Sequence, residues 1–194
     1  MGIAPIAQPP SQGTAVQQLL SEAEIHAGVA RLAAEIEAFY GPHRRLTIVG
    51  VMTGSVVLLA DLIRRLPRPL RVGLVQARSY RGASTTPGAL TIRGEMLPDV
   101  RDRDVLVVDD IFDTGQTLFE LFLELDQLGP ASIRSLVLLR KQGRARVPIA
   151  PDHVGFDIPD RFVVGYGLDF QDAYRNLPYV AALDEAELAA GPPP

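Results

Sequence analysis

Two adjacent carboxylates that follow a strongly apolar run are the first residues of this sequence that could do chemistry. Val105-Leu-Val-Val108 predicts a buried strand because it is almost entirely β-branched, and Asp109 and Asp110 come directly after it. Adjacent strand residues point to opposite faces, so the two acids can act together only if the strand ends there. At the tip of a strand both could reach a ribose diol or the cation bound to it.

A polar turn that opens a helix comes next, in Asp113-Thr-Gly-Gln-Thr117. The backbone N–H groups of residues 114–117 and the hydroxyls of Thr114 and Thr117 would face the positive end of the helix dipole, where they could bind one phosphate monoester. The alternative is a turn whose acid and threonines only cap the helix. Neither G-x-x-x-x-G-K-[ST] nor G-x-G-x-x-G after a strand occurs, so a standard nucleotide-binding loop is excluded. The spacing suits a sugar phosphate.

The elements that must position these residues alternate between strands and helices. Apolar residues at three- and four-residue spacing predict an amphipathic helix over 21–40, with Ser21 as its cap. Apolar runs and turn residues predict the other elements, which are strands at 46–51, 70–77, 105–108, 132–139 and around 162–164, and helices at 56–66 and 116–128. Continuous apolar strands that alternate with helices are typical of a parallel sheet covered on both faces. The sequence therefore predicts a doubly wound α/β domain.

A single domain with two tails is expected from the length and the ends of the chain. The 194 residues suffice to bury one core. Residues 1–15, rich in Pro, Gln, Ser and Gly, predict a flexible N-terminal tail ahead of a domain at 16–186, and 187–194, which end in Gly-Pro-Pro-Pro, predict a loose C-terminal tail. The polar stretch Ser79–Pro98 predicts a mobile flap, because loops of this length tend to be lids or binding loops.

The composition argues against several classes of protein. With 47% hydrophobic and 22% charged residues the chain is globular, and no apolar run approaches the roughly 20 residues of a membrane span. The first residues lack a secretory signal and there is no cysteine, so we expect a cytoplasmic location. A net charge of -4 argues against broad nucleic-acid binding. His26, His43 and His153 lack metal-ligand spacing, so no zinc site is predicted.

The segment Val107–Leu118 resembles the phosphoribosyl-pyrophosphate motif of type I phosphoribosyltransferases, in which two acids precede a D-T-G-x-T loop. From about Glu22 to Leu183 the chain is similar to the hypoxanthine-guanine branch of that family. The matching pieces follow the family order and are Gly50–Ser55, Ser79-Tyr80, Leu138–Lys141, Val154–Asp169 and Tyr174–Pro178. The resemblance implies the type I phosphoribosyltransferase fold, a mostly parallel sheet flanked by helices, with a mobile flap and a small base-binding hood.

The resemblance also implies roles for individual residues. Asp113 is expected to face N7 of a purine as the general base or acid. Phosphoribosyl pyrophosphate is expected to contact Thr53, Gly54, Asp109, Asp110, Asp113, Thr114, Gly115, Gln116, Thr117 and Arg175. The purine is expected to contact Lys141, Phe162, Val163 and Asp169, and Mg²⁺ to contact Asp109, Asp110 and Asp169. Ser79 and Tyr80 would lie on the flap. The implied partners are these small molecules and further copies of the chain, as a homodimer or homotetramer, with no nucleic acid and no membrane.

A 6-oxopurine substrate gives physical sense to the expected base contacts. A lysine ammonium can donate to O6, and an aromatic ring stacks on a base with about 1–3 kcal/mol. Adenine presents a donor amine at that position, so a buried Lys141 would lack an acceptor and adenine would be rejected. The implied reaction joins hypoxanthine or guanine to the ribose of phosphoribosyl pyrophosphate and releases pyrophosphate.

One position departs from the family, and two other functions stay open. Many members carry Lys or Arg where this chain has Thr53, so pyrophosphate binding there must depend on the backbone. The family often holds this loop in a cis peptide, which would be Met52-Thr53 or the next bond, although Gly54 could equally mark only a tight turn. The open alternatives are a regulatory or nucleic-acid-binding protein that keeps the fold, and an enzyme for xanthine or a pyrimidine.

Overall fold

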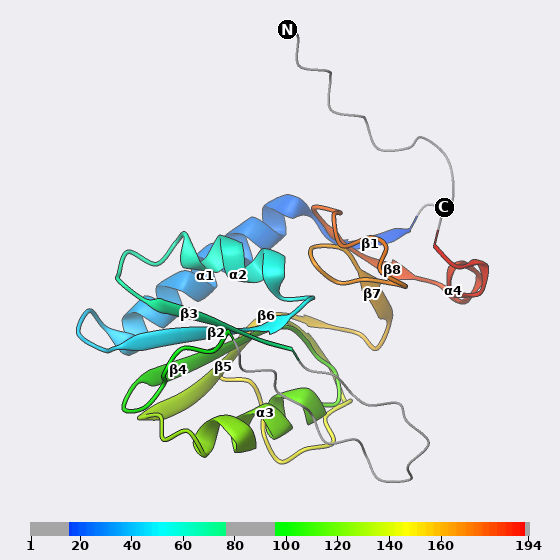
Figure 1. Ribbon diagram of the computed structural model, residues 1–194. Coiled ribbons are helices and arrows are strands. Elements are labelled where there is room, and N and C mark those ends of the chain that lie inside the picture. The colour runs from blue at the N-terminus through cyan, green and yellow to red at the C-terminus, as the bar shows by residue number, and fades with distance from the viewer. Residues whose placement is uncertain (1–15, 77–95, 193–194) are drawn as a thin grey trace, which may run out of the picture.

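Two sheets organise the chain in the computed structural model, which describes residues 16–76 and 96–192 (Figure 1). The larger sheet has five parallel strands, in the order β3 (Arg71–Gln76), β2 (Leu46–Met52), β4 (Asp104–Phe112), β5 (Ser132–Lys141) and β6 (His153–Ile158). The predicted α/β fold with a mostly parallel sheet is confirmed. Ser79, Tyr80 and most of the predicted flap lie outside the described residues.

Helices cover both faces of the larger sheet, with α1 (Glu22–Tyr40) and α2 (Val56–Ile63) on one face and α3 (Gln116–Asp126) on the other (Figure 1). The predicted cap of α1 is confirmed, because the Ser21 hydroxyl accepts from the Glu24 N–H while the Glu24 carboxylate accepts from the Ser21 N–H. This reciprocal capping box satisfies two backbone groups that a helix start leaves unpaired.

Alternate residues of the central strands divide the core between the two faces. Ile48, Leu106 and Leu136 pack with α1 and α2, whereas their neighbours Val49, Val107 and Val137 pack with α3. Successive strand side chains point to opposite faces, so a strand covered on both sides must be apolar throughout. This double burial explains the continuous apolar runs by which the sequence predicted these strands.

β4 continues past the two acids, so the expectation that the strand ends there is wrong. Pairing of β4 with β2 stops at Val108, whereas pairing with β5 continues to Phe112. Hydrogen bonds to the backbone of β5 therefore keep β4 extended beyond Val108, where the predicted apolar run of β4 ends. The N–H groups of Asp110 and Ile111 donate to the carboxylates of Asp109 and Asp110, at 3.0 and 2.7 Å, and both carboxylates lie against the backbone at this end of β4.

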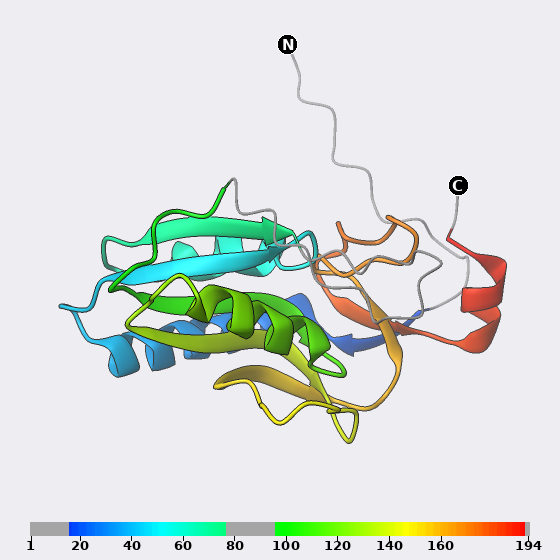
Figure 2. The same cartoon turned by 60° about the horizontal axis from the view of Figure 1, so that its bottom comes forward.

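A smaller antiparallel sheet lies beyond the carboxyl ends of the large sheet's strands (Figures 1 and 2). Its order is β1 (Gln17–Leu20), β8 (Val180–Leu183) and β7 (Phe162–Val164). This sheet, with the loops between β7 and β8, stands where the resemblance implies a hood, and we call residues 162–183 the hood. Only β7 was predicted, because its Phe-Val-Val run is aromatic and β-branched, whereas β1 (Gln-Gln-Leu-Leu) and β8 (Val-Ala-Ala-Leu) contain few residues of those types.

Two further elements were not predicted. β6 pairs in parallel with β5, but Gly155 and Asp157 interrupt the apolar pattern of this edge strand. The short helix α4 (Glu185–Ala190) begins with a capping box between Asp184 and Glu187. Residues 187–190, which were expected in a loose tail, are therefore helical.

A buried tyrosine fastens the hood to the main domain. The Tyr166 hydroxyl donates to Asp61 of α2 at 2.7 Å, and the ring is almost fully buried among core residues. Burial is the largest effect on the pKa of Tyr166 and raises it. The hydrogen bond to Asp61 and the negative charge of Asp61 raise this pKa further. The tyrosine therefore remains a neutral donor across the physiological pH range.

The described residues include no helix whose length and apolar character would suit a membrane span.

Replacing Tyr166 with phenylalanine tests the attachment of the hood. The loss of one buried hydrogen bond to a charged acceptor should lower the free energy of unfolding by about 1–3 kcal/mol, measured by urea denaturation. Tyr179→Phe is the matched control, because the Tyr179 hydroxyl makes no hydrogen bond within residues 16–76 and 96–192. Equal stability of the two variants would contradict the attachment.

Candidate active site

The strand order creates a crevice between β2 and β4. From β2 the chain passes through α2 to β3 on one side, and from β4 it passes through α3 to β5 on the other. Ligands of open α/β sheets bind at such a point, outside the carboxyl ends of the strands. A cavity of about 330 Å³ lies there. It is lined by every residue expected to contact phosphoribosyl pyrophosphate, namely Thr53, Gly54, Asp109, Asp110, Asp113, Thr114, Gly115, Gln116, Thr117 and Arg175.

The loop at 113–117 presents the start of α3 to this cavity. Gly115 is the N-cap of α3, and its φ of 84° is a left-handed conformation that glycine adopts without steric cost. A glycine has no side chain to cap the helix, and the Thr114 hydroxyl accepts only a long hydrogen bond of 3.4 Å from the Gln116 N–H. The first N–H groups of α3 are therefore largely left for an anion, which favours the phosphate interpretation over simple capping.

The two acids of β4 bring unbalanced negative charge into the cavity. Burial is the largest effect on Asp109 and raises its pKa, and the negative charge of Asp110 raises it further. Burial also raises the pKa of Asp110, although hydrogen bonds and the positive charge of Arg175 act in the opposite direction. Each carboxylate would be easier to ionise with a cation beside it.

The loop after β2 meets these acids through a glycine. The peptide bond between Met52 and Thr53 is cis, which is the first of the two bonds considered above. A Cβ atom on Gly54 would overlap the Asp110 carboxylate, and a Cβ atom on Gly167 of the hood would overlap the Gly54 carbonyl oxygen. Gly54 therefore marks a close approach of three segments and not merely a tight turn.

An ion pair of the hood completes one wall of the cavity. The Arg175 guanidinium lies 2.8 Å from the Asp169 carboxylate and donates to the Gly167 carbonyl oxygen at 2.8 Å. The other Asp169 oxygen accepts from the Asp172 N–H at 2.9 Å. Both Arg175 and Asp169 line the cavity, so the structure brings these two expected site residues to the acids of β4.

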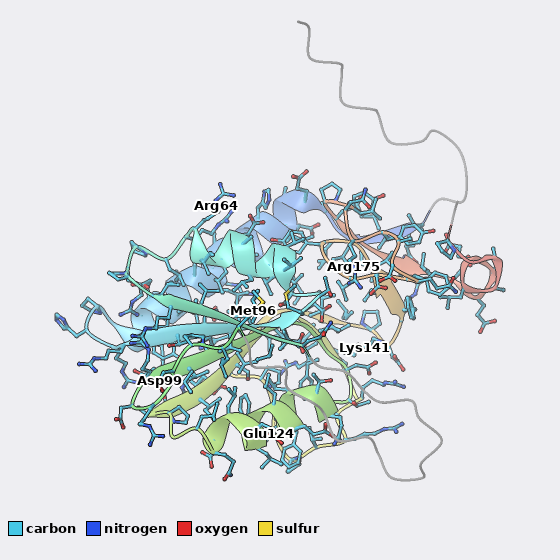
Figure 3. The ribbon with its side chains drawn as sticks, viewed as in Figure 1. Arg64, Met96, Asp99, Glu124, Lys141 and Arg175 are labelled. Carbon is cyan, nitrogen blue, oxygen red and sulfur yellow. The ribbon has the colours of Figure 1, made fainter. Side chains whose placement is uncertain are left out.

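A lysine connects the cavity to the region expected for the base. The Lys141 ammonium at the end of β5 lies 3.3 Å from the Asp113 carboxylate, and its side chain is only 10% exposed. Lys141 is the single lysine among the 19 lysine and arginine residues of the chain. Lys141 and Arg175 lie at the same end of the large sheet (Figure 3).

Of the four residues expected to contact the base, only Asp169 lines the cavity, and Lys141, Phe162 and Val163 do not. Phe162 has an exposed ring, 41% accessible, that meets Phe170 edge to face with 5.5 Å between the ring centroids. Val163 is buried. Asp160, two residues before Phe162, lies 3.5 Å from the Lys141 ammonium, so the start of β7 is close to the lysine.

Sequence reasoning missed Arg144 and Asp160. The Arg144 guanidinium donates to Asp113 at 2.9 Å and lies 3.3 Å from Asp160, which also contacts Lys141. Burial acts to raise the pKa of Asp113, but the hydrogen bond from Arg144 and the charge of Lys141 outweigh it and hold the pKa below its ordinary value. The only sequence signal was the basic run at 140–146, which follows a predicted strand.

The donor set is compatible with magnesium that is shared with a substrate. Within the described residues no three His, Cys, Asp or Glu side chains form a metal-binding group. Magnesium often takes one or two carboxylates and completes its coordination with water and substrate oxygens. Asp109, which is buried, and Asp110, which is partly buried, have no positive partner in hydrogen-bond contact among these residues and fit that kind of site.

Comparisons with known proteins agree with this geometry. The family model described as phosphoribosyl transferase domain matches residues 15–171. The hypoxanthine phosphoribosyltransferase of Haemophilus influenzae is 38% identical over 167 residues, which cover 85% of this chain and 93% of that protein. The hypoxanthine-guanine phosphoribosyltransferase of Aquifex aeolicus is 37% identical over 174 residues, which cover 90% of this chain and 98% of that protein.

Solved structures show the same relationship. A hypoxanthine-guanine phosphoribosyltransferase from Bacillus anthracis superposes with a TM-score of 0.82 and 33% identity, covering 88% of this chain and 100% of that chain. A hypoxanthine phosphoribosyltransferase from Trypanosoma cruzi gives a TM-score of 0.85 and 32% identity, covering 94% of this chain and 98% of that chain. The chain belongs to the phosphoribosyltransferase family, among its hypoxanthine-guanine members.

Proposed function

We propose that this chain transfers the 5-phosphoribosyl group from phosphoribosyl pyrophosphate to hypoxanthine, guanine or both, giving the nucleoside monophosphate and pyrophosphate. The observation that carries the proposal is the contact of Lys141 with Asp113 at the edge of a cavity lined by the sugar-phosphate loop. A donor for O6 and an acceptor for the N7 proton are then adjacent to the site for the activated sugar. We expect the enzyme to act in the cytoplasm as a homodimer or homotetramer.

The proposed reaction needs one proton acceptor on the protein. N9 of the base forms a bond to C1′ while the bond from C1′ to the pyrophosphate oxygen breaks, and the electron pair of that bond leaves with pyrophosphate. The proton on N7 passes to Asp113, which Lys141 and Arg144 keep ionised at neutral pH. Arg175 and the N–H groups at the start of α3 are the groups we assign to the pyrophosphate and the 5′-phosphate.

Magnesium is the cofactor we propose, held by Asp109 and Asp110 together with oxygens of the substrate. When bound, it would supply positive charge to the departing pyrophosphate. Asp169 is the further ligand implied by the family, and it would exchange its contact with Arg175 for that role. Thr53 offers no positive charge to the pyrophosphate, so the backbone of residues 53–54 must bind it instead.

Base selectivity follows from the single lysine. The Lys141 ammonium is a donor only, so it matches the O6 acceptor of hypoxanthine and guanine and opposes the amine of adenine. Phe162, with its exposed ring, is the residue we assign to stacking on the base, and the backbone of Val163 to contacting its edge. Xanthine shares O6 and remains the alternative substrate to be tested.

The decisive assay is pyrophosphate release with phosphoribosyl pyrophosphate, magnesium and each of hypoxanthine, guanine, xanthine, adenine and uracil. Turnover is expected with hypoxanthine or guanine and not with adenine. Asp113→Asn should slow it by about 10²–10⁴-fold, because it removes the proton acceptor. Asp157→Asn is the matched control, since Asp157 pairs with Arg140 and does not line the cavity. Tight binding of phosphoribosyl pyrophosphate with no turnover of any base would favour a regulatory protein instead.

The single lysine permits a test of base binding without turnover. An amine-acylating reagent can modify only Lys141 and the N-terminal amine of this chain. Guanosine monophosphate should protect Lys141, because its O6 would occupy the ammonium and its base would cover the side chain. Peptide mass spectrometry measures the protection, and the N-terminal amine serves as an internal control. Equal labelling of Lys141 with and without the nucleotide would contradict the assignment.

Asp109→Asn should stabilise the protein while it impairs catalysis. The pKa of Asp109 is higher in the folded protein than in the unfolded chain. The folded protein therefore loses stability as the pH rises from the pKa that Asp109 has in the unfolded chain to the pKa that it has in the folded protein. At pH 7 without magnesium the variant should therefore gain about 0.5–2 kcal/mol in free energy of unfolding.

The gain should shrink as the pH falls through about 4, the ordinary pKa of an aspartate, because below it Asp109 carries its proton in the unfolded state as well as in the folded one. Chemical denaturation at several pH values, with Asp157→Asn as the control, measures the difference. A variant that is less stable than the wild type at pH 7 would contradict this prediction. It would show that other groups of the folded protein already stabilise the ionised Asp109.

A further inference from the structure

The segment that follows β5, residues 144–147, lies against the loop at 113–117 and contacts it at three successive points. Arg144 Nε donates to Asp113 Oδ1 at 2.9 Å, and the Arg146 N–H donates to the Thr114 carbonyl oxygen at 2.9 Å. Val147 packs so closely on Gly115 that a Cβ atom there would come within 2.5 Å of Val147 Cγ2. The segment therefore fixes both the backbone of the loop and the Asp113 side chain from outside the cavity.

The two carboxylate oxygens of Asp113 have different partners. Oδ1 accepts from Arg144 Nε at 2.9 Å, and Oδ2 accepts from Lys141 Nζ at 3.3 Å. Asp160 contacts both cations, with Oδ1 at 3.5 Å from Lys141 and Oδ2 at 3.3 Å from Arg144. When Lys141 turns to a purine oxygen, Oδ2 becomes open to N7 while Arg144 still holds Oδ1.

Arg144 does not itself line the cavity, whereas Asp113 does. Its guanidinium is partly exposed and is bound on one side by Asp113 and on the other by Asp160. An arginine that is bound by two acids has a defined orientation. Its contact with Asp113 therefore also restricts the orientation of the Asp113 carboxylate. Within residues 16–76 and 96–192, the charged groups in contact with Asp113 are Lys141 from β5 and Arg144 from the following loop.

We propose that Arg144 is a positioning residue for phosphoribosyl transfer: it holds Asp113 with Oδ2 directed to N7 of the base, and it acts only through Asp113. The inference rests on the proposed function, in which Oδ2 receives the N7 proton. Without Arg144, Oδ1 loses this partner, and among the residues that the structure describes Lys141 becomes the one remaining cation in contact with the carboxylate.

The test compares Arg144→Gln with Arg140→Gln, a matched control near the end of β5. Arg140 forms a similarly exposed ion pair with Asp157, at 2.6 Å, away from the cavity. Arg144→Gln should lower kcat/KM for hypoxanthine by about 10–100-fold, the scale expected from a misplaced catalytic group, and leave KM for phosphoribosyl pyrophosphate unchanged. Arg144→Lys, which keeps the charge, should recover part of the loss, and it provides the same comparison if Arg144→Gln does not fold.

Two further measurements separate positioning from a general structural role. The inhibition constant of 7-deazahypoxanthine, in which a C–H replaces N7, should be the same in the wild type and Arg144→Gln, because this analogue has no N7 proton to give. In an Asp113→Asn background, Arg144→Gln should cause little further loss of activity, since its effect passes through Asp113.

The proposal would be overturned if Arg144→Gln weakened the binding of hypoxanthine and of its 7-deaza analogue equally. It would also be overturned if Arg144→Gln lowered activity as much in the Asp113→Asn background as in the wild type, or if its kinetics matched those of the wild type. Each of these results requires a wild-type protein that turns over a 6-oxopurine. Absence of wild-type turnover would instead refute the proposed function itself, so the two failures are distinguishable.

Discussion

The pairing of β4 with β5 beyond the last residue that pairs with β2 is the constraint on which the rest of the site depends. A strand held on one side only has an open edge, and here that edge carries Asp109 and Asp110. Because β5 extends equally far, its last residue, Lys141, reaches the level of the loop that follows β4. One difference in strand length thus leaves the acids at the edge of the cavity and brings the lysine to Asp113.

The positive groups around the cavity are already paired with acids. Lys141 and Arg144 share Asp113 and Asp160, and Arg175 pairs with Asp169. Among the described residues, an anionic substrate must therefore take these cations from their acidic partners and does not meet a free positive charge. Such an arrangement lowers the net gain on binding, but it fixes each side chain before the substrate arrives. It also lets a chain with a net charge of -4 bind anions at a defined place.

The parts of the structure that local residues determine could be predicted from the sequence. Ser21 and Glu24 cap α1 through their own side chains, and the apolar runs of β2, β4 and β5 are determined by burial on both faces. The extension of β4 was not predictable in this way, because its hydrogen bonds come from β5. The contact of Arg144 with Asp113 joins residues that are 31 positions apart and depends on the path of the loop after β5. β1 and β8 contain few β-branched or aromatic residues, so their sequences show no strand pattern.

The glycines at 54 and 167 link the acids of β4, the loop after β2 and the hood through contacts that leave no room for a side chain. Gly167 also has a φ of 101°, so any other residue there would be strained as well as crowded. In a library of random variants, both positions should therefore tolerate almost no replacement, although neither glycine has a side chain that could contact the substrate. Such intolerance would reflect the assembly of the cavity walls, and it would separate architectural requirements from chemical ones in this family.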